Sequence, residues 1–229
     1  MTELWNALIK AIELIFTFDS EVMQIAGRSL QFALTSTAIG SIICIPIACL
    51  IHFNEFFGKK FITVGIIQTL YSVPTVAIGL FVFVFISRAG PFGWLGLLFT
   101  PTAIVIGQVL LITPLLLGLT ISALSGMDRN IPDTARSMGA SNFQMALLVL
   151  KEARFAVMAA VILAFGRAIS EVGVSIMVGG NIRGFTRVLT TAISLETSKG
   201  DLEFSLALGM ILIFIALMVN IIMNRIWQR

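Results

Sequence analysis

Five long stretches of this chain are almost free of charged residues, and each is long enough to cross a lipid bilayer as a helix. A helix rises 1.5 Å per residue, so about 20 mostly apolar residues span the hydrocarbon layer. The positions of the charges place the predicted spans at residues 29–51, 61–87, 101–124, 155–179 and 204–224. None of them has the strict apolar–polar alternation that is typical of a transmembrane β-strand. The sequence therefore predicts an all-α, polytopic membrane protein with about five transmembrane helices.

The composition supports this fold class and excludes others. Of the 229 residues, 58% are hydrophobic and only 12% are charged, and a soluble domain usually carries about 25% charge. These values exclude a soluble enzyme, a disordered chain and a nucleic-acid-binding module, because each of those needs more surface charge. Two cysteines, Cys44 and Cys49, and a single histidine, His52, predict no disulfide framework, metal site or cofactor.

The charges in the loops predict the orientation in the membrane. Loops on one side of the predicted spans carry eight Lys and Arg residues, and loops on the other side carry six. Cytoplasmic loops have the excess of positive residues in membrane proteins. We therefore expect an external N-terminus, a cytoplasmic loop at residues 128–151 and a cytoplasmic tail at residues 225–229.

Residues 1–28 are predicted to form an extracytoplasmic segment before the first span. Apolar residues recur at helical spacing in residues 1–20, without the basic start and small-residue cleavage site of a signal peptide. The segment is expected to be an amphipathic helix in the membrane interface. The alternative is an ordered arm packed on the helix bundle.

The cytoplasmic loop contains the most specific local pattern in the chain. Pro132 suits the first position of a helix, and Asp133 suits its positive N-terminal end. Gly139 suits the left-handed conformation that ends a helix. Ser141 with Gln144 three residues later forms a capping box that starts another helix. The pattern predicts two short helices around a glycine turn. They could dock on a cytoplasmic partner, or form a simple interfacial connection between spans.

Two opposite charges interrupt the fourth predicted span. Arg167 lies roughly 18 Å along a helix that starts at Phe155, near the middle of a bilayer. Charges at that depth cost about 2.5–3.5 kcal/mol each and usually face a partner or water. Glu171 lies one helical turn away on the same face. The pair could be structural, or Arg167 could line an anion pathway with Glu171 setting its position.

The loop after the fourth span offers neutral and cationic hydrogen-bond donors. It begins with Gly179-Gly180-Asn181 and continues through Arg183 and Thr186-Arg187. Such groups suit an oxyanion, so Asn181 and Thr186 are candidate residues of a translocation path. A glycine-rich turn by itself is a weak indication.

The segment around Gly139 resembles the EAA loop of ABC-transporter permeases. Asp133, Thr134 and Ala135 occupy the position of the Glu-Ala-Ala triplet, and Gly139, Ala140 and Ser141 match the glycine and the residues after it. The family's following Leu-Pro pair is replaced by Lys151-Glu152. The resemblance implies an ATPase-coupling site made of Asp133, Ala135, Gly139, Ala140 and Ser141. The chain has no G-x-x-x-x-G-K-[ST] phosphate loop, so it is expected to be a transport subunit, not an enzyme, that relies on a separate ATPase.

Residues 165–193 resemble the permeases for tetrahedral oxyanions, and the form Ser170-Glu171-Val172-Gly173 is most similar to tungstate permeases. The resemblance covers residues 20–224 and implies a type I, MetI-like bundle, with a permease domain at residues 29–224. It implies the permease subunit of an ATP-driven importer, with ABC ATPase subunits, an extracytoplasmic substrate-binding protein and a second copy of the permease as partners. A bacterial or archaeal cell membrane is the implied location.

Three alternatives remain open from the sequence. The chain could be a molybdate or sulfate permease of the same kind. It could be a gradient-driven secondary transporter in which Arg167 and Glu171 form a relay or counter-ion pair. It could also be a membrane anchor of a larger complex.

Overall fold

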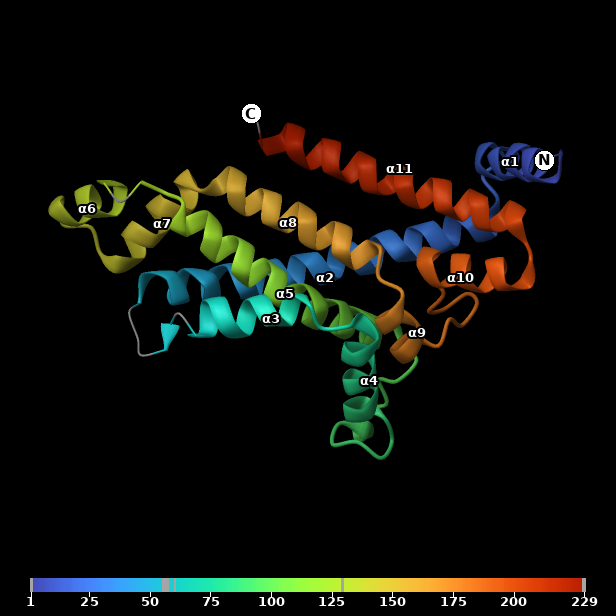
Figure 1. Cartoon of the computed structure of the whole chain (residues 1–229), viewed down its shortest axis with the longest axis horizontal. Coiled ribbons are helices and arrows are strands. Elements are labelled where there is room, and N and C mark those ends of the chain that lie inside the picture. The colour runs from blue at the N-terminus through green and yellow to red at the C-terminus, as the bar shows by residue number, and fades with distance from the viewer. Residues whose placement is uncertain (1, 55–57, 60, 129, 228–229) are drawn as a thin grey trace.

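Every regular element in the described part of the chain, residues 2–54, 58–59, 61–128 and 130–227 of a computed structural model, is a helix (Figure 1). Four helices run along the long axis of the molecule: α2 (Ser20–Phe53), α5 (Pro101–Ser125), α8 (Arg154–Ile169) and α11 (Leu202–Trp227). Helices α6 (Asn130–Ser137) and α7 (Asn142–Glu152) lie at one end. Helices α1 (Thr2–Phe16) and α10 (Leu189–Lys199) lie at the other. The predicted fold class is confirmed.

Three of the five predicted spans are single long apolar helices: α2, α5 and α11. Helix α2 begins at Ser20, well before the predicted start of the span at residue 29. The Asp19 carboxylate caps it by accepting hydrogen bonds from the Glu21 and Val22 backbone N–H groups, both at 3.0 Å. The charge-free residues mark only the apolar middle of this helix. Its first turns contain charged residues but belong to the same hydrogen-bond ladder. Helix α11 continues to Trp227, so the predicted tail is mostly helix; residues 228–229 lie outside the described part.

The predicted span at residues 61–87 is broken into pieces. A π-helical turn at Phe61–Ile66 leads into α3 (Ile67–Tyr71), and α4 (Thr75–Ile86) begins after Pro74. Proline has no N–H and disfavours helical geometry in the residue before it, which explains the break. Helix α4 then points away from the long helices in the view of Figure 1. This segment is therefore no continuous transmembrane helix.

The predicted span at residues 155–179 is a bent pair of helices. Helix α8 ends at Ile169, and α9 (Gly173–Gly179) continues at an angle of 55°. Counted as one span, the pair brings the described spanning helices to four. The break contains Glu171, so its side chain does not project from a continuous helix.

A buried polar network ties the central helices together. Gln108 on α5 hydrogen-bonds the Ser36 hydroxyl on α2 through Oε1 at 2.7 Å. Its Nε2 donates to the backbone carbonyl of Ala168 on α8 at 3.1 Å. Both polar side chains are buried. In an apolar bundle such hydrogen bonds between helices fix the register of packing.

Helix α1 packs on α11. Ala7 and Ala11 are buried, and Lys10 Nζ lies 3.0 Å from Glu203 Oε2. That contact raises the pKa of the Lys10 ammonium. Trp5 and Phe16 remain exposed. The packed-arm alternative describes this arrangement, and the exposed rings leave an interfacial position as a prediction.

Candidate functional site

The loop at residues 128–152 forms a compact helical knob at one end of the molecule. Helix α6 ends in a Schellman turn: the Ala140 N–H donates to the Ala135 carbonyl at 3.0 Å, and the Gly139 N–H donates to the Arg136 carbonyl at 2.9 Å. Gly139 has a φ of +81°, in the left-handed region. The predicted helix, glycine turn and helix are confirmed.

The start of each knob helix is defined by a side chain. Ser141 and Gln144 form the predicted capping box, with the Ser141 N–H donating to Gln144 Oε1 at 2.9 Å. Helix α6 begins at Asn130, whose N–H donates to Asp128 Oδ1 at 3.0 Å. The prediction that Pro132 is the first helical residue is therefore wrong. The helix begins two residues before Pro132, at Asn130, whose N–H is bound by the Asp128 carboxylate.

The knob is anchored on one side and open on the other. Val149 of α7 is buried in one cluster with Leu124 of α5 and Val157 of α8, and Met145 of the same helix is also buried. Of the predicted coupling residues, Ala135 is buried and Ala140 half-buried, whereas Asp133, Gly139 and Ser141 are exposed. Next to them in the sequence are the exposed apolar side chains of Met138 and Phe143, 83% and 73% accessible. Such a pair at the tip of a rigid turn is suited to a partner surface.

The second predicted site lies at the break between α8 and α9. Arg167 Nη1 lies 3.6 Å from Glu171 Oε2, so the expected ion pair is confirmed. Glu171 is buried, and its Oε1 accepts a hydrogen bond from the Val174 N–H at 3.0 Å. The Arg167 side chain is 41% exposed. Because 3.6 Å is beyond hydrogen-bond distance, the guanidinium is charge-balanced without being fully saturated by its partner.

Each charge of this pair is matched to a helix end. Arg167 lies in the last turn of α8, where the helix dipole is negative. Glu171 lies at the start of α9 and binds its first turn, where the dipole is positive. The break therefore explains how two charges persist inside an apolar bundle.

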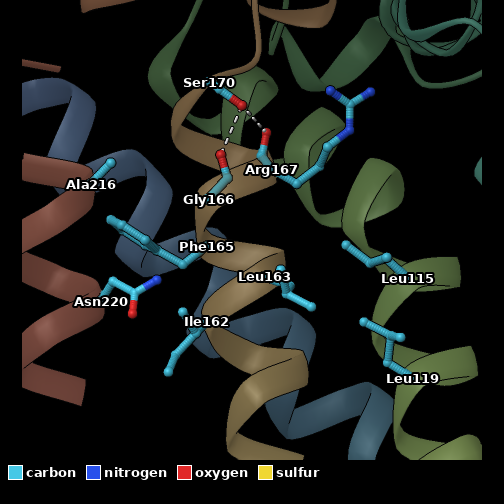
Figure 2. Close-up of a pocket in the computed structure, with 10 residues that line it drawn as sticks. All are labelled: Leu115, Leu119, Ile162, Leu163, Phe165, Gly166, Arg167, Ser170, Ala216 and Asn220. Atoms are coloured by element: carbon cyan, nitrogen blue, oxygen red, sulfur yellow. Dashed lines mark hydrogen bonds between the residues drawn. The ribbon is translucent and has the colours of Figure 1, made fainter. Parts of the chain in front are cut away.

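Arg167 borders a mostly apolar pocket of about 540 Å³ between α5, α8 and α11 (Figure 2). Its guanidinium extends from α8 on the side of α5, above Leu115 and Leu119 in the view of Figure 2. The Ser170 hydroxyl, also at the pocket, donates to the Gly166 carbonyl at 2.7 Å. The pocket thus offers a cation beside apolar walls, a suitable lining for an anion that must not be held too tightly.

The loop after α9 uses its neutral polar groups internally. The Thr186 hydroxyl bonds the Gly179 carbonyl and accepts from the Ile182 N–H at 3.0 Å. Asn181 exchanges hydrogen bonds with Thr191, whose hydroxyl donates to Asn181 Oδ1 at 2.9 Å. Both predicted path residues therefore shape this loop, and among the described residues neither makes a hydrogen bond with Arg167. Their role in a translocation path stays a prediction.

Sequence reasoning missed an ion-pair cluster that joins this loop to α2. Arg183 makes a bidentate pair with Glu21, which raises the pKa of the Arg183 guanidinium by hydrogen bonding. Arg187 Nη1 lies 3.6 Å from Glu21 Oε1 and 3.5 Å from Glu196 Oε1. Glu21 and Arg183 are separated by 162 residues. No local sequence signal connects residues that far apart.

Comparison with known proteins identifies relatives over nearly the whole chain. A family model described as "Binding-protein-dependent transport system inner membrane component" matches residues 42–229. The tungstate uptake system permease protein TupB of Peptoclostridium acidaminophilum is 39% identical over 210 residues, which cover 92% of each chain. The protein of the same name from Campylobacter jejuni is 37% identical over 223 residues, 97% of this chain and 93% of the relative.

A solved structure shares the fold. An inward-facing conformation of the MetNI methionine ABC transporter superposes with a TM-score of 0.71, covering 92% of this chain and 96% of that one. The sequence identity is 14%, so the likeness concerns the fold alone.

Proposed function

Because the chain belongs to the family of binding-protein-dependent transport system inner membrane components, we propose that it is the permease subunit of an ATP-driven importer for a tetrahedral oxyanion, tungstate in particular. The observation that carries the proposal is the 39% identity, over 92% of both chains, to a permease named for tungstate uptake. A second relative with that name, from another bacterium, matches 97% of this chain. The chain is a multi-pass membrane protein with an all-helical permease fold.

The translocation path is proposed to pass the α8–α9 break. The half-exposed Arg167 supplies a cation at an apolar pocket, and Glu171 keeps that cation in place. A dianion would gain from the charge, while the nearby carboxylate and the single arginine limit how tightly it is held. A path must release its substrate, so moderate attraction suits transport better than a closed binding site.

A second copy of the permease completes the path. Helix α4 leaves several large apolar side chains exposed, among them Val76, Leu80 and Phe81. One chain with four or so spans is also thin for an enclosed path. Two copies related by a two-fold axis are therefore proposed to enclose one path.

The knob is proposed to seat in a partner ATPase. Its exposed Met138 and Phe143 would fill an apolar cleft, and the Schellman turn at Gly139 holds them in a fixed geometry. Helix α7, packed against α5 and α8, would carry the motion of the ATPase into the bundle. The two permeases would then alternate between inward and outward opening. The knob lies on the cytoplasmic side and the N-terminus outside, where a substrate-binding protein delivers the anion.

Reconstitution tests the proposal. The permease, its ATPase and its receptor are placed in liposomes, and uptake of tungstate, molybdate and sulfate is measured with and without ATP. We expect ATP-dependent tungstate uptake, reduced at least tenfold by Arg167→Ala and less by Arg167→Lys, with the exposed Arg88→Ala, in the loop after α4, as a control for charge loss elsewhere. Uptake that persists without ATP would instead support a gradient-driven transporter, and no uptake of any oxyanion would refute the proposal.

A further inference from the structure

Helix α10 lies at the end of the molecule opposite the knob (Figure 1). A cluster of charged side chains surrounds this helix. We call it the terminal cluster, and its members are Glu21, Arg28, Arg183, Arg187, Glu196 and Lys199. It joins the first helix of the bundle to the loop after α9 and to α10. Ser29, next to Arg28, fixes this junction, because its Oγ accepts the N–H of Leu189, the first residue of α10, at 2.7 Å.

Each carboxylate of the terminal cluster contacts two cations. Glu21 binds Arg183 through both oxygens and lies 3.6 Å from Arg187. Glu196 contacts Lys199 at 3.0 Å and Arg187 at 3.5 Å. The two contacts of Arg187 are therefore long, and each is to a carboxylate that has a closer partner. Arg187 therefore has two carboxylates near it, each of which is paired more closely with another cation.

The cluster has an excess of positive charge. Its four cations and two carboxylates leave a net charge of +2. Three further carboxylates at this end keep their negative charge but bind groups outside the cluster. Asp19 caps α2, Asp201 accepts the Phe204 N–H at 3.0 Å, and Glu203 pairs with Lys10. The positive end of the α10 dipole, held against Ser29, adds to the excess.

Two guanidinium groups in the cluster have unused hydrogen-bond donors. Arg187 is only 9% exposed, yet its Nε has no hydrogen-bond partner among the described residues. The buried Nε of the half-buried Arg28 has none there either. Arg28 and Arg187 are brought near each other by the hydrogen bond that joins Ser29, next to Arg28, to Leu189, two residues after Arg187. A buried donor without a partner costs free energy, so an acceptor that reached both Nε atoms would offset that cost.

The neutral donors of the neighbouring loop cannot fill that role. Asn181 and Thr186 are occupied by Thr191 and by the loop backbone. The Val188 N–H donates to the Thr191 hydroxyl at 3.1 Å. Any acceptor bound here would therefore be recognised by the arginines.

We propose that the terminal cluster is a binding site for a tetrahedral oxyanion dianion, held between Arg28 and Arg187 as the anion enters the path. A dianion matches the net charge of +2, and tetrahedral oxygens suit guanidinium donors on two sides. Glu21 and Glu196 compete with the anion for Arg187, so the site loads and empties without a deep energy minimum. The identity of the anion as transported substrate rests on the proposed function.

The site also connects to the break that contains Arg167. The Thr190 hydroxyl, in the first turn of α10, donates to the backbone carbonyl of Glu171 at 2.7 Å. An anion at the N-terminal end of α10 is thus one hydrogen bond away from the residue that holds Arg167. The two arginine sites are successive stations for the same anion.

Direct binding tests the inference separately from transport. The permease–ATPase complex is placed in phosphatidylcholine nanodiscs without receptor or ATP, and bound tungstate is measured by equilibrium dialysis and metal analysis. We expect saturable binding that sulfate displaces and chloride does not. Arg28→Gln and Arg187→Gln should each weaken it at least tenfold, and the matched control Arg88→Gln, in the loop after α4, should leave it unchanged.

A carboxylate variant gives an effect of opposite sign. Glu196→Gln removes a competitor of the anion and should tighten tungstate binding several-fold. A purely structural salt-bridge cluster would give no tighter binding. Arg28 makes no ion pair with another described residue, so Arg28→Gln keeps the test valid if Arg187→Gln fails to fold.

Other results would overturn the inference. These are no saturable binding, equal weakening by Arg88→Gln, or loss of tungstate binding when phosphatidylglycerol replaces phosphatidylcholine, which would assign the site to a lipid phosphate. If such a result accompanies normal ATP-dependent uptake in the reconstituted importer, only the site is refuted. If uptake is absent while the arginine-dependent binding is present, only the proposed function is refuted.

Discussion

Substitution of Gly139 separates the shape of the knob from its volume. The glycine has a φ of +81°, and a Cβ added to it would meet nothing within 4 Å. A side chain there clashes with no neighbour, so the whole cost is that of the left-handed backbone. For an ordinary L-residue this is about 1–2 kcal/mol. Asparagine adopts the left-handed conformation more readily than β-branched valine does.

The proposed coupling converts this cost into a measurable loss of affinity. In Gly139→Val, the free energy needed to hold the turn in its left-handed form is subtracted from the free energy of ATPase binding. At 1.4 kcal/mol per tenfold change, the dissociation constant should therefore rise by about 5- to 30-fold. Gly139→Asn should stay within a few-fold of the wild type. The affinity of each permease variant for the ATPase is measured by titration on immobilised nanodiscs.

The thermal stability of the bundle provides the control, because Gly139 is exposed at the tip of the knob. Both variants should unfold at the temperature of the wild type. Equal losses of affinity for Asn and Val would show that bulk and not backbone geometry matters. No loss for Val would show that the turn does not present the docking surface.

Two further predictions concern packing within the bundle and are measured by thermal denaturation in detergent. Glu171→Ala removes the acceptor of the buried Val174 N–H and should destabilise the protein by about 1–3 kcal/mol. Glu171→Gln keeps an acceptor oxygen and should cost less than half as much, and equal costs would assign the stabilisation to the ion pair. Gly107→Ala places a Cβ 2.3 Å from Val174 Cγ1, which is fully buried, and should cost about 1–3 kcal/mol. The control Gly209→Ala meets nothing within 4 Å and should stabilise its helix by about 0.5–1 kcal/mol; similar melting temperatures for the two variants would contradict the packing.

Local chemistry made the knob predictable from the sequence. A capping box and a glycine turn depend on residues three to five positions apart, and Ser141, Gln144 and Gly139 occupy the expected geometry. The Arg167–Glu171 pair was predictable for the same reason, since the two residues are only four positions apart. The apolar content likewise identified α5 and α11 almost to their ends.

The breaks and the terminal cluster depend on longer-range information. The start of α9 depends on the hydrogen bond that Glu171 accepts from the Val174 N–H. In the sequence, Glu171 is only a charge that interrupts an apolar span. The early start of α2 places Glu21 on a helix where it pairs with Arg183, a residue far along the chain. The outer-loop candidates Asn181 and Thr186 were chosen by residue type, and the fold instead shows their polar groups engaged within the loop and α10.

The opposite polarity of the helix ends at the α8–α9 break gives the buried ion pair a direction. A double exchange that places Glu at position 167 and Arg at position 171 would conserve net charge and pairing distance, yet each charge would then oppose the dipole of its own helix end. The pair is therefore favoured by both helix dipoles only with the arginine at the end of α8 and the glutamate at the start of α9. Charge complementarity between the two residues is insufficient to define it.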